Sequence, residues 1–93
     1  MKFKTETGTR YEILDNETIK KNDVFIFNYI LLGSINPRYI SLNPKPHLTD
    51  YDHLKTNTRE FLKGEQLVFQ KKNQAGEMQR KLHISSTIVK IKH

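Results

Sequence analysis

The sequence contains no cysteine and no tryptophan, and only four glycines and three prolines in 93 residues. Without cysteine, neither a disulfide nor a thiolate metal site can form, which excludes the disulfide-stapled secreted domains. The longest apolar run, residues 24–32, contains Asn28 and is about half as long as a membrane span. Residues 1–6 are charged and lack the apolar core of a signal peptide. These absences predict a soluble protein of a reducing cytoplasm, with no membrane partner.

Groups that commonly carry nucleophilic catalysis are also scarce. No cysteine is present, and no serine lies in a glycine-flanked turn or beside an evident His–Asp pair. His83 and Lys81 are conceivable acid–base groups of a small ribonuclease, although a half-exposed histidine on a strand is the commoner situation. The sequence therefore predicts no catalytic residue and no cofactor, and a protein that is not an enzyme.

One short segment carries several possible metal ligands. Two histidines and two aspartates lie close together there: His47, Asp50, Asp52 and His53. Imidazole and carboxylate groups bind zinc or manganese. However, paired metal histidines on a helix are four residues apart, whereas His47 and His53 are six apart. An acidic helix start with exposed histidines nearby is the simpler interpretation, and no metal site is predicted.

The apolar pattern predicts a mainly β protein with residues 1–93 forming a single domain. Alternation on both sides of Gly8 indicates one hairpin, and residues 67–84 indicate another. Between Ile84 and Val89 the apolar positions change from even to odd, which one regular strand cannot do, so residues 85–87 should contain a bulge or turn. We expect a small SH3-like barrel or a strongly bent antiparallel sheet of five to six strands.

Two further expectations concern single segments. Residues 50–62 are the candidate for one short helix, with Asp50 and Asp52 near its start and Gly64 after its end; an ordered loop is the alternative. Residues 24–32 are apolar on both parities, which is typical of a central strand covered on both sides. Five residues are predicted to be buried in the core: Phe25, Phe27, Phe69, Ile84 and Val89.

The net charge of +6 comes from sixteen Lys and Arg against ten Asp and Glu, and the excess lies mostly in residues 70–93. Such a concentration indicates a surface for phosphate or for an acidic protein, or else lysines that protect edge strands from pairing. With twelve lysines and four arginines, contacts to nucleic acid should be mainly to its backbone. The predicted binding residues form a basic hairpin and its flanks: Lys71, Lys72, Arg80, Lys81, Lys90, Lys92, Arg10, Arg38 and Tyr39.

Three segments resemble a loose set of short uncharacterised proteins of phages and mobile elements. They are residues 7–13 (TGTRYEI), 64–69 (GEQLVF) and 85–91 (SSTIVKI). Gln66 and Thr87 stand where that set has proline, and the set's central tryptophan is missing. The resemblance implies a β-barrel and a phage-related origin, with the host-cell cytoplasm as the location. By analogy alone, it also suggests an accessory protein of the anti-CRISPR kind.

Three functional hypotheses follow. The first is a non-catalytic phage-type protein that occupies a surface of a host protein, such as a defence nuclease that it inhibits. The second is a small basic barrel that binds DNA or RNA through backbone contacts, and the third is a small nuclease. A monomer and a homodimer are both compatible with the sequence.

Overall fold

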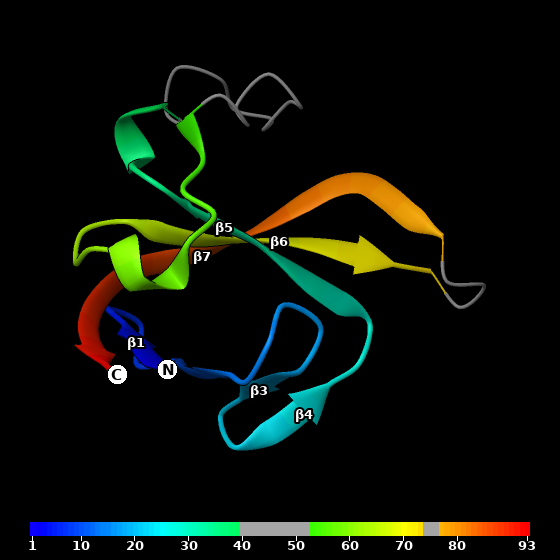
Figure 1. The fold of residues 1–93 in the computed structure, drawn as a ribbon, viewed down its shortest axis with the longest axis horizontal. Helices are drawn as coiled ribbons and strands as arrows, with labels where there is room; N and C mark the ends of the chain where they lie inside the picture. Colours follow the sequence, from blue (N-terminus) through cyan, green and yellow to red (C-terminus); the bar gives the residue numbers. More distant parts are fainter. Residues whose placement is uncertain (40–52, 74–76) are drawn as a thin grey trace.

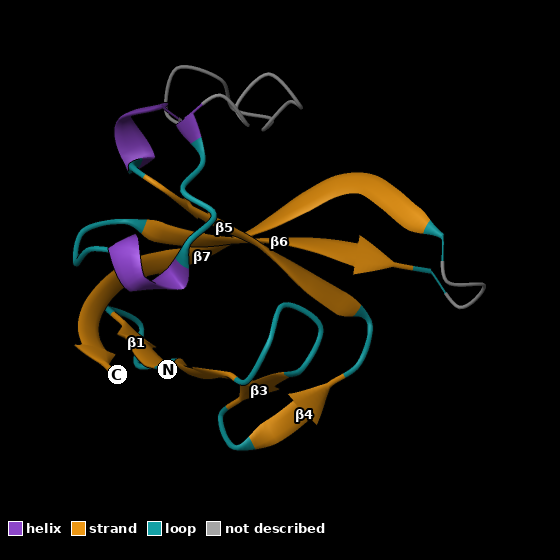
Figure 2. Cartoon of the chain, viewed as in Figure 1, coloured by secondary structure: helices purple, strands orange, loops and turns teal. Residues whose placement is uncertain are grey.

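The computed structural model describes residues 1–39, 53–73 and 77–93, and the protein is mainly β, as predicted (Figures 1 and 2). Seven antiparallel strands form one sheet in the order β4-β3-β2-β1-β7-β6-β5, where five or six were expected. The strands are β1 (Lys2–Thr5), β2 (Arg10–Ile13), β3 (Ile19–Lys21), β4 (Val24–Ile26), β5 (Tyr29–Ile35), β6 (Gln66–Lys72) and β7 (Met78–Lys92).

Strand β7 belongs to both halves of this sheet. Its first part pairs with β6 and its last part pairs with β1, and the strand curves from one to the other (Figure 1). Midway, Ser85 and Ser86 together lie opposite the single residue Leu67, because the register moves from Val68 opposite Ile84 to Gln66 opposite Thr87. This bulge confirms the prediction for residues 85–87. The Leu67 amide donates a hydrogen bond to Ser85 Oγ at 2.9 Å, which satisfies a buried backbone group at the bulge.

A second irregularity in β7 makes the prediction for Val89 wrong. Thr5 pairs with Ile88 and Lys4 pairs with Lys90, so Val89 is an extra residue in the β1–β7 ladder. Ile88 is buried, whereas 41% of Val89 is exposed. Because Ile88 lies opposite Thr5 and Lys90 lies opposite Lys4, the two residues that flank the extra residue point to opposite faces of the sheet. The simple alternation assumed for residues 88–91 therefore does not hold.

Residues 24–32 do not form one central strand. They contain β4 and the first part of β5, which are the two outermost strands in the sheet order. Ahead of them, Asn22 and Asp23 connect β3 to β4 with φ angles of 51° and 69°. Positive φ at both positions is typical of a two-residue hairpin turn that matches the twist of the strands. Because β4 is an edge strand, its side chains have fewer neighbours to cover them.

The core lies on the inner face of the bent sheet. Phe3 contacts the ring of Phe61, and Tyr11 contacts that of Phe69, with centroid distances of 5.7 and 5.3 Å. The buried residues of this core are Phe3, Tyr11, Ile13, Ile19, Leu31, Phe61, Leu67, Phe69 and Ile88. Phe69 is therefore buried as predicted, and Ile84 is only half-buried. The prediction is wrong for Phe25 and Phe27, which are 43% and 83% exposed.

The predicted helix at 50–62 is replaced, over its described part, by irregular chain. Residues 50–52 lie outside the described residues, and from 53 onward the one continuous helical turn is the 3-10 turn η3 (Thr58–Glu60). Lys55 forms an isolated β-bridge with Ser34, which is incompatible with a helix there. Buried Glu65 anchors this segment. Its carboxylate accepts a hydrogen bond from the Leu62 amide at 2.7 Å and forms an ion pair with Lys55 at 2.8 Å.

Over the described parts of the chain, no helix has the length and apolar character needed to cross a bilayer.

Candidate functional site

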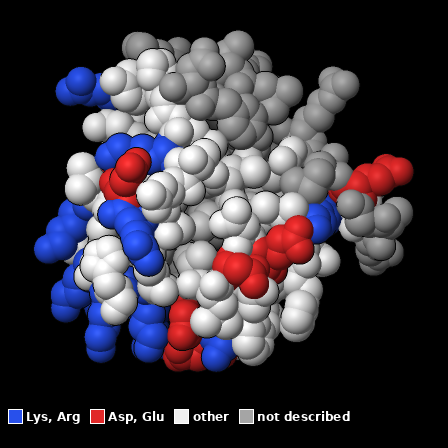
Figure 3. All heavy atoms as spheres, in the orientation of Figure 1, with Lys and Arg blue, Asp and Glu red and all other residues white. Residues whose placement is uncertain are grey.

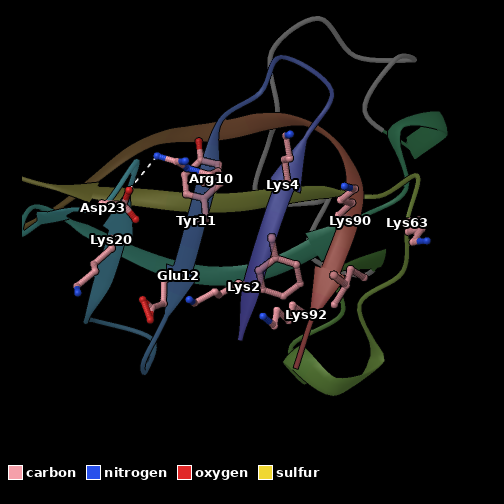
Figure 4. A pocket seen from close by; sticks show the side chains of 12 residues that line it. Lys2, Lys4, Arg10, Tyr11, Glu12, Lys20, Asp23, Lys63, Lys90 and Lys92 are labelled. Carbon is pink, nitrogen blue, oxygen red and sulfur yellow. Dashed lines mark hydrogen bonds and ion pairs between the residues drawn. The ribbon is translucent and has the colours of Figure 1, made fainter.

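The outer face of the sheet over β1, β2, β3 and the end of β7 carries a dense group of cations. Lys2 lies opposite Lys92, and Lys4 lies opposite both Lys90 and Arg10. Directly opposite residues of antiparallel strands project on the same side, so these side chains share one face. We call this surface the basic face, and it consists of Lys2, Lys4, Arg10, Lys20, Lys90 and Lys92 (Figure 4).

The basic face has few compensating acids. Glu12 lies between Lys2 and Lys20 in the cross-strand register, and Asp23 pairs with Arg10 at 2.8 Å. Among the described residues, Glu12 is the only acid that lies opposite any of the four lysines of β1 and β7. The side chains line a groove of about 590 Å³, and Lys63 stands at its rim beside Lys90 (Figure 4). Figure 3 shows the same concentration as blue side chains along the lower left of the molecule.

The spacing of these cations follows from strand geometry. Side chains on neighbouring strands are about 5 Å apart, and those two residues apart on one strand are about 7 Å apart. Lys2, Lys4, Lys90 and Lys92 therefore form the corners of a small rectangle of positive charge. Like charges directly opposite one another destabilise a sheet, so the arrangement has an electrostatic cost in the absence of an anion.

Protection of sheet edges does not explain the two lysines of β1 in the basic face. Lysines that discourage pairing are expected on edge strands, where unpaired backbone groups are exposed. Here Lys2 and Lys4 belong to an interior strand, because β1 has β2 on one side and β7 on the other, whereas the last part of β7, with Lys90 and Lys92, pairs with β1 alone. The edges are β4 and β5.

The structure divides the predicted binding residues among several places. Arg10, Lys90 and Lys92 lie on the basic face. The predicted basic hairpin lies in the other half of the sheet, in β6 and the start of β7, where Lys71 and Lys72 are half-buried and Lys72 approaches Glu17 at 3.7 Å.

The remaining predicted residues do not join the basic face. Arg80 and Lys81 are in the first part of β7, and their side chains lie outside the described part. Arg38 and Tyr39 belong to the 3-10 turn η1 (Pro37–Tyr39), where the Tyr39 ring stacks on His53 at 3.9 Å.

Sequence reasoning missed Lys2, Lys4 and Lys20. The alternation of residues 2–7 does predict that Lys2 and Lys4 face solvent together. The sequence does not show that β1 pairs with the end of β7, and it is this pairing that places the lysines of residues 2–4 beside those of residues 90–92.

An exposed aromatic pair adjoins the basic face. Phe25 of β4 lies opposite Lys20, whose Nζ is 4.7 Å from the centre of the Phe25 ring. The Phe27 ring stacks on Phe25 at a centroid distance of 6.2 Å and an interplanar angle of 23°. Phe25 and Phe27, which we call the aromatic pair, therefore continue the basic face toward the β4 edge of the sheet.

A second, smaller hollow of about 320 Å³ lies between the two halves of the sheet. Its walls include the rings of Tyr11, Tyr29, Phe69 and His83. Burial, together with the nearby Tyr29, raises the pKa of Tyr11 above its usual value.

In residues 1–39, 53–73 and 77–93 no group of three or more potential metal ligands comes together. Of the sequence cluster considered above, only His53 falls within those ranges.

Comparison with known proteins gives no relative: no protein-family model matches the chain, and neither a curated protein nor a solved structure is significantly similar to it. The fold and the site therefore define the protein only as a small bent antiparallel sheet with one strongly basic face.

Proposed function

We propose that this protein binds nucleic acid through its basic face, mainly by contacts to the phosphate backbone, and that it acts by binding rather than by catalysis. The observation that supports this proposal is the pairing of Lys2 with Lys92 and of Lys4 with Lys90 between the adjacent strands β1 and β7. Anions placed between these lysines relieve the repulsion between like charges. A chain of phosphates supplies several such anions at once.

The composition of the face favours backbone contacts over reading of bases. Five of its six cations are lysines, which bind phosphate as flexible point charges. The single arginine, Arg10, is already engaged by Asp23 and is therefore not an open bidentate reader of guanine. Binding should accordingly be weakly sequence-specific and strongly dependent on salt.

The test is to neutralise two lysines of the basic face and measure the salt dependence of binding. Lys4→Gln with Lys90→Gln keeps most of each side-chain stem and removes two opposed charges. Because about 0.7–0.9 counterions are released per phosphate contact, losing two contacts should make the slope of log Kobs against log salt shallower by about 1.4–1.8. Fluorescence anisotropy with a labelled oligonucleotide measures both the affinity and the slope.

The matched control is Lys21→Gln with Arg59→Gln. Both residues are exposed and lie off the basic face, and Lys21 is the chain neighbour of Lys20 on the opposite side of β3. The two double variants have the same net charge. Equal losses of affinity in both would show that total charge, and not this face, governs binding, and would contradict the proposal.

Attachment to an acidic surface of a host protein is the second candidate, with inhibition of a defence nuclease as one form of it. It is favoured by the apolar side chains exposed at the β4 edge, Val24 and Phe27, which are 64% and 83% exposed. A pull-down from host lysate, with and without nuclease treatment, distinguishes the two candidates. A partner that is retained after nuclease treatment and that the Lys4/Lys90 variant no longer captures would favour the protein partner.

A further inference from the structure

From the aromatic pair we infer that the nucleic acid bound by the basic face is single-stranded, and that unpaired bases stack on Phe25 and Phe27 while the backbone lies along the lysines. This inference rests on the function proposed above. It adds the strandedness of the ligand and the residues that determine it.

The position of the aromatic pair connects it to the phosphate-binding surface. The cross-strand register runs from Phe25 to Lys20, then to Glu12, Lys2 and Lys92, so all five residues lie in one row on one face. Neighbouring strands are about 4.8 Å apart, so the row is about 19 Å long. A single strand of a few nucleotides spans this distance and meets cations at one end and aromatic rings at the other.

The exposure of the rings is difficult to explain by folding alone. Phe27 is 83% exposed, and burying a phenylalanine is normally a favourable contribution to folding. The two rings cover each other only in part, with a centroid distance of 6.2 Å. Phe27 follows the edge strand β4, so its outer surface is open to a ligand that arrives along the basic face.

A duplex does not present the chemistry that these rings accept. Its bases are already stacked on one another, whereas the bases of a single strand have open faces. A positively charged groove bordered by aromatic side chains is how proteins bind single strands without reading their sequence. The Lys20 ammonium lies on the Phe25 ring and is also within the row of cations, so it links the stacking surface to the phosphate path.

The test compares three labelled probes of about 12 nucleotides, a length within the usual range for single-strand sites. They are an oligodeoxythymidylate, its abasic analogue with the same phosphates, and a duplex. Removing one stacking ring usually weakens binding by about fivefold to a hundredfold. We therefore expect Phe27→Ala to lose about that factor for oligodeoxythymidylate, with an unchanged salt slope and unchanged binding of the abasic probe.

Val24→Ala is the matched control, because Val24 is an exposed apolar residue of the adjoining strand β4 that lies opposite Lys21 on the other face. It should bind all three probes as the wild type does. Circular dichroism and thermal melting confirm that both variants are folded, as expected for such exposed side chains.

The outcomes separate the two proposals. If Phe27→Ala binds oligodeoxythymidylate like the wild type, or if the wild type prefers the duplex, base stacking is wrong while backbone binding by the basic face stands. If the wild type binds no nucleic-acid probe at low salt, the proposed function itself is wrong. Tighter binding of poly-L-glutamate than of any oligonucleotide would overturn both and indicate an acidic protein partner.

Discussion

Gly33 of β5 is the position where one added carbon should do the most damage to the fold. A Cβ built on Gly33 would overlap the backbone carbonyl oxygen of Lys55 and would lie 3.0 Å from Leu54 Cγ. A backbone carbonyl cannot rotate away as a side chain can. Gly33→Ala must therefore push the segment that contains Lys55 away from β5.

That displacement breaks specific interactions whose contributions can be added. Ser34 and Lys55 exchange two backbone hydrogen bonds, of 2.9 and 2.8 Å, each with a net worth of about 0.5–1.5 kcal/mol. Moving Lys55 also strains its ion pair with the buried Glu65, although the hydrogen bond from the Leu62 amide to Glu65 is retained. Together these losses predict that the free energy of unfolding falls by about 2–4 kcal/mol, a large part of the stability of a small domain.

Urea unfolding followed by circular dichroism measures this loss, with Gly8→Ala as the control. Gly8 has a φ of 87°, but no atom lies within 4 Å of an added Cβ, so its cost is backbone strain alone, about 1–2 kcal/mol. Gly33→Ala should therefore lower the midpoint further than Gly8→Ala does. A Gly33→Ala protein as stable as the Gly8→Ala control would refute the close packing of Lys55 on β5.

Two further predictions concern the bulge and the core. Ser85→Ala leaves the buried Leu67 amide without its acceptor, so we expect a loss of about 1–3 kcal/mol in urea unfolding, against a smaller loss for Ser86→Ala, whose hydroxyl bonds an exposed threonine. The raised pKa of Tyr11 means that the folded state holds the phenolic proton more tightly than the unfolded state, so the unfolding free energy should fall as pH rises above about 10. Tyr11→Phe should make this fall smaller; an identical pH profile would show that burial of the hydroxyl does not contribute.

The fold was predictable where a local pattern determined it. The alternation of apolar and polar residues around Gly8 correctly predicted the β1–β2 hairpin. The change of the apolar positions from even to odd after Ile84 correctly predicted the bulge. The same reasoning failed for Phe25 and Phe27, because an apolar run looks alike in a central strand and in two short strands. The distinguishing signal was Asn22-Asp23, a pair suited to a tight hairpin turn with positive φ.

The site was predictable only in part, because it is assembled from distant segments. Lys90 and Lys92 stand out as charged residues of the basic last quarter, and Arg10 as a basic neighbour of Tyr11. Their grouping with Lys2 and Lys4 depends on the pairing of β1 with β7, which no local periodicity encodes. Charge density along the sequence instead drew attention to Lys71 and Lys72, which lie in the other half of the sheet.

The shared strand β7 also imposes an order on folding. Its pairing with β6 joins segments that are close in the chain, whereas its pairing with β1 brings residue 2 against residue 92. Contacts of such high sequence separation form slowly, because the entropy of loop closure must be overcome first. The ladder that closes last is thus the one in which lysine faces lysine. If a polyanion binds across that ladder, as proposed above, it binds the closed form best, and the native state should gain stability as the concentration of that polyanion rises.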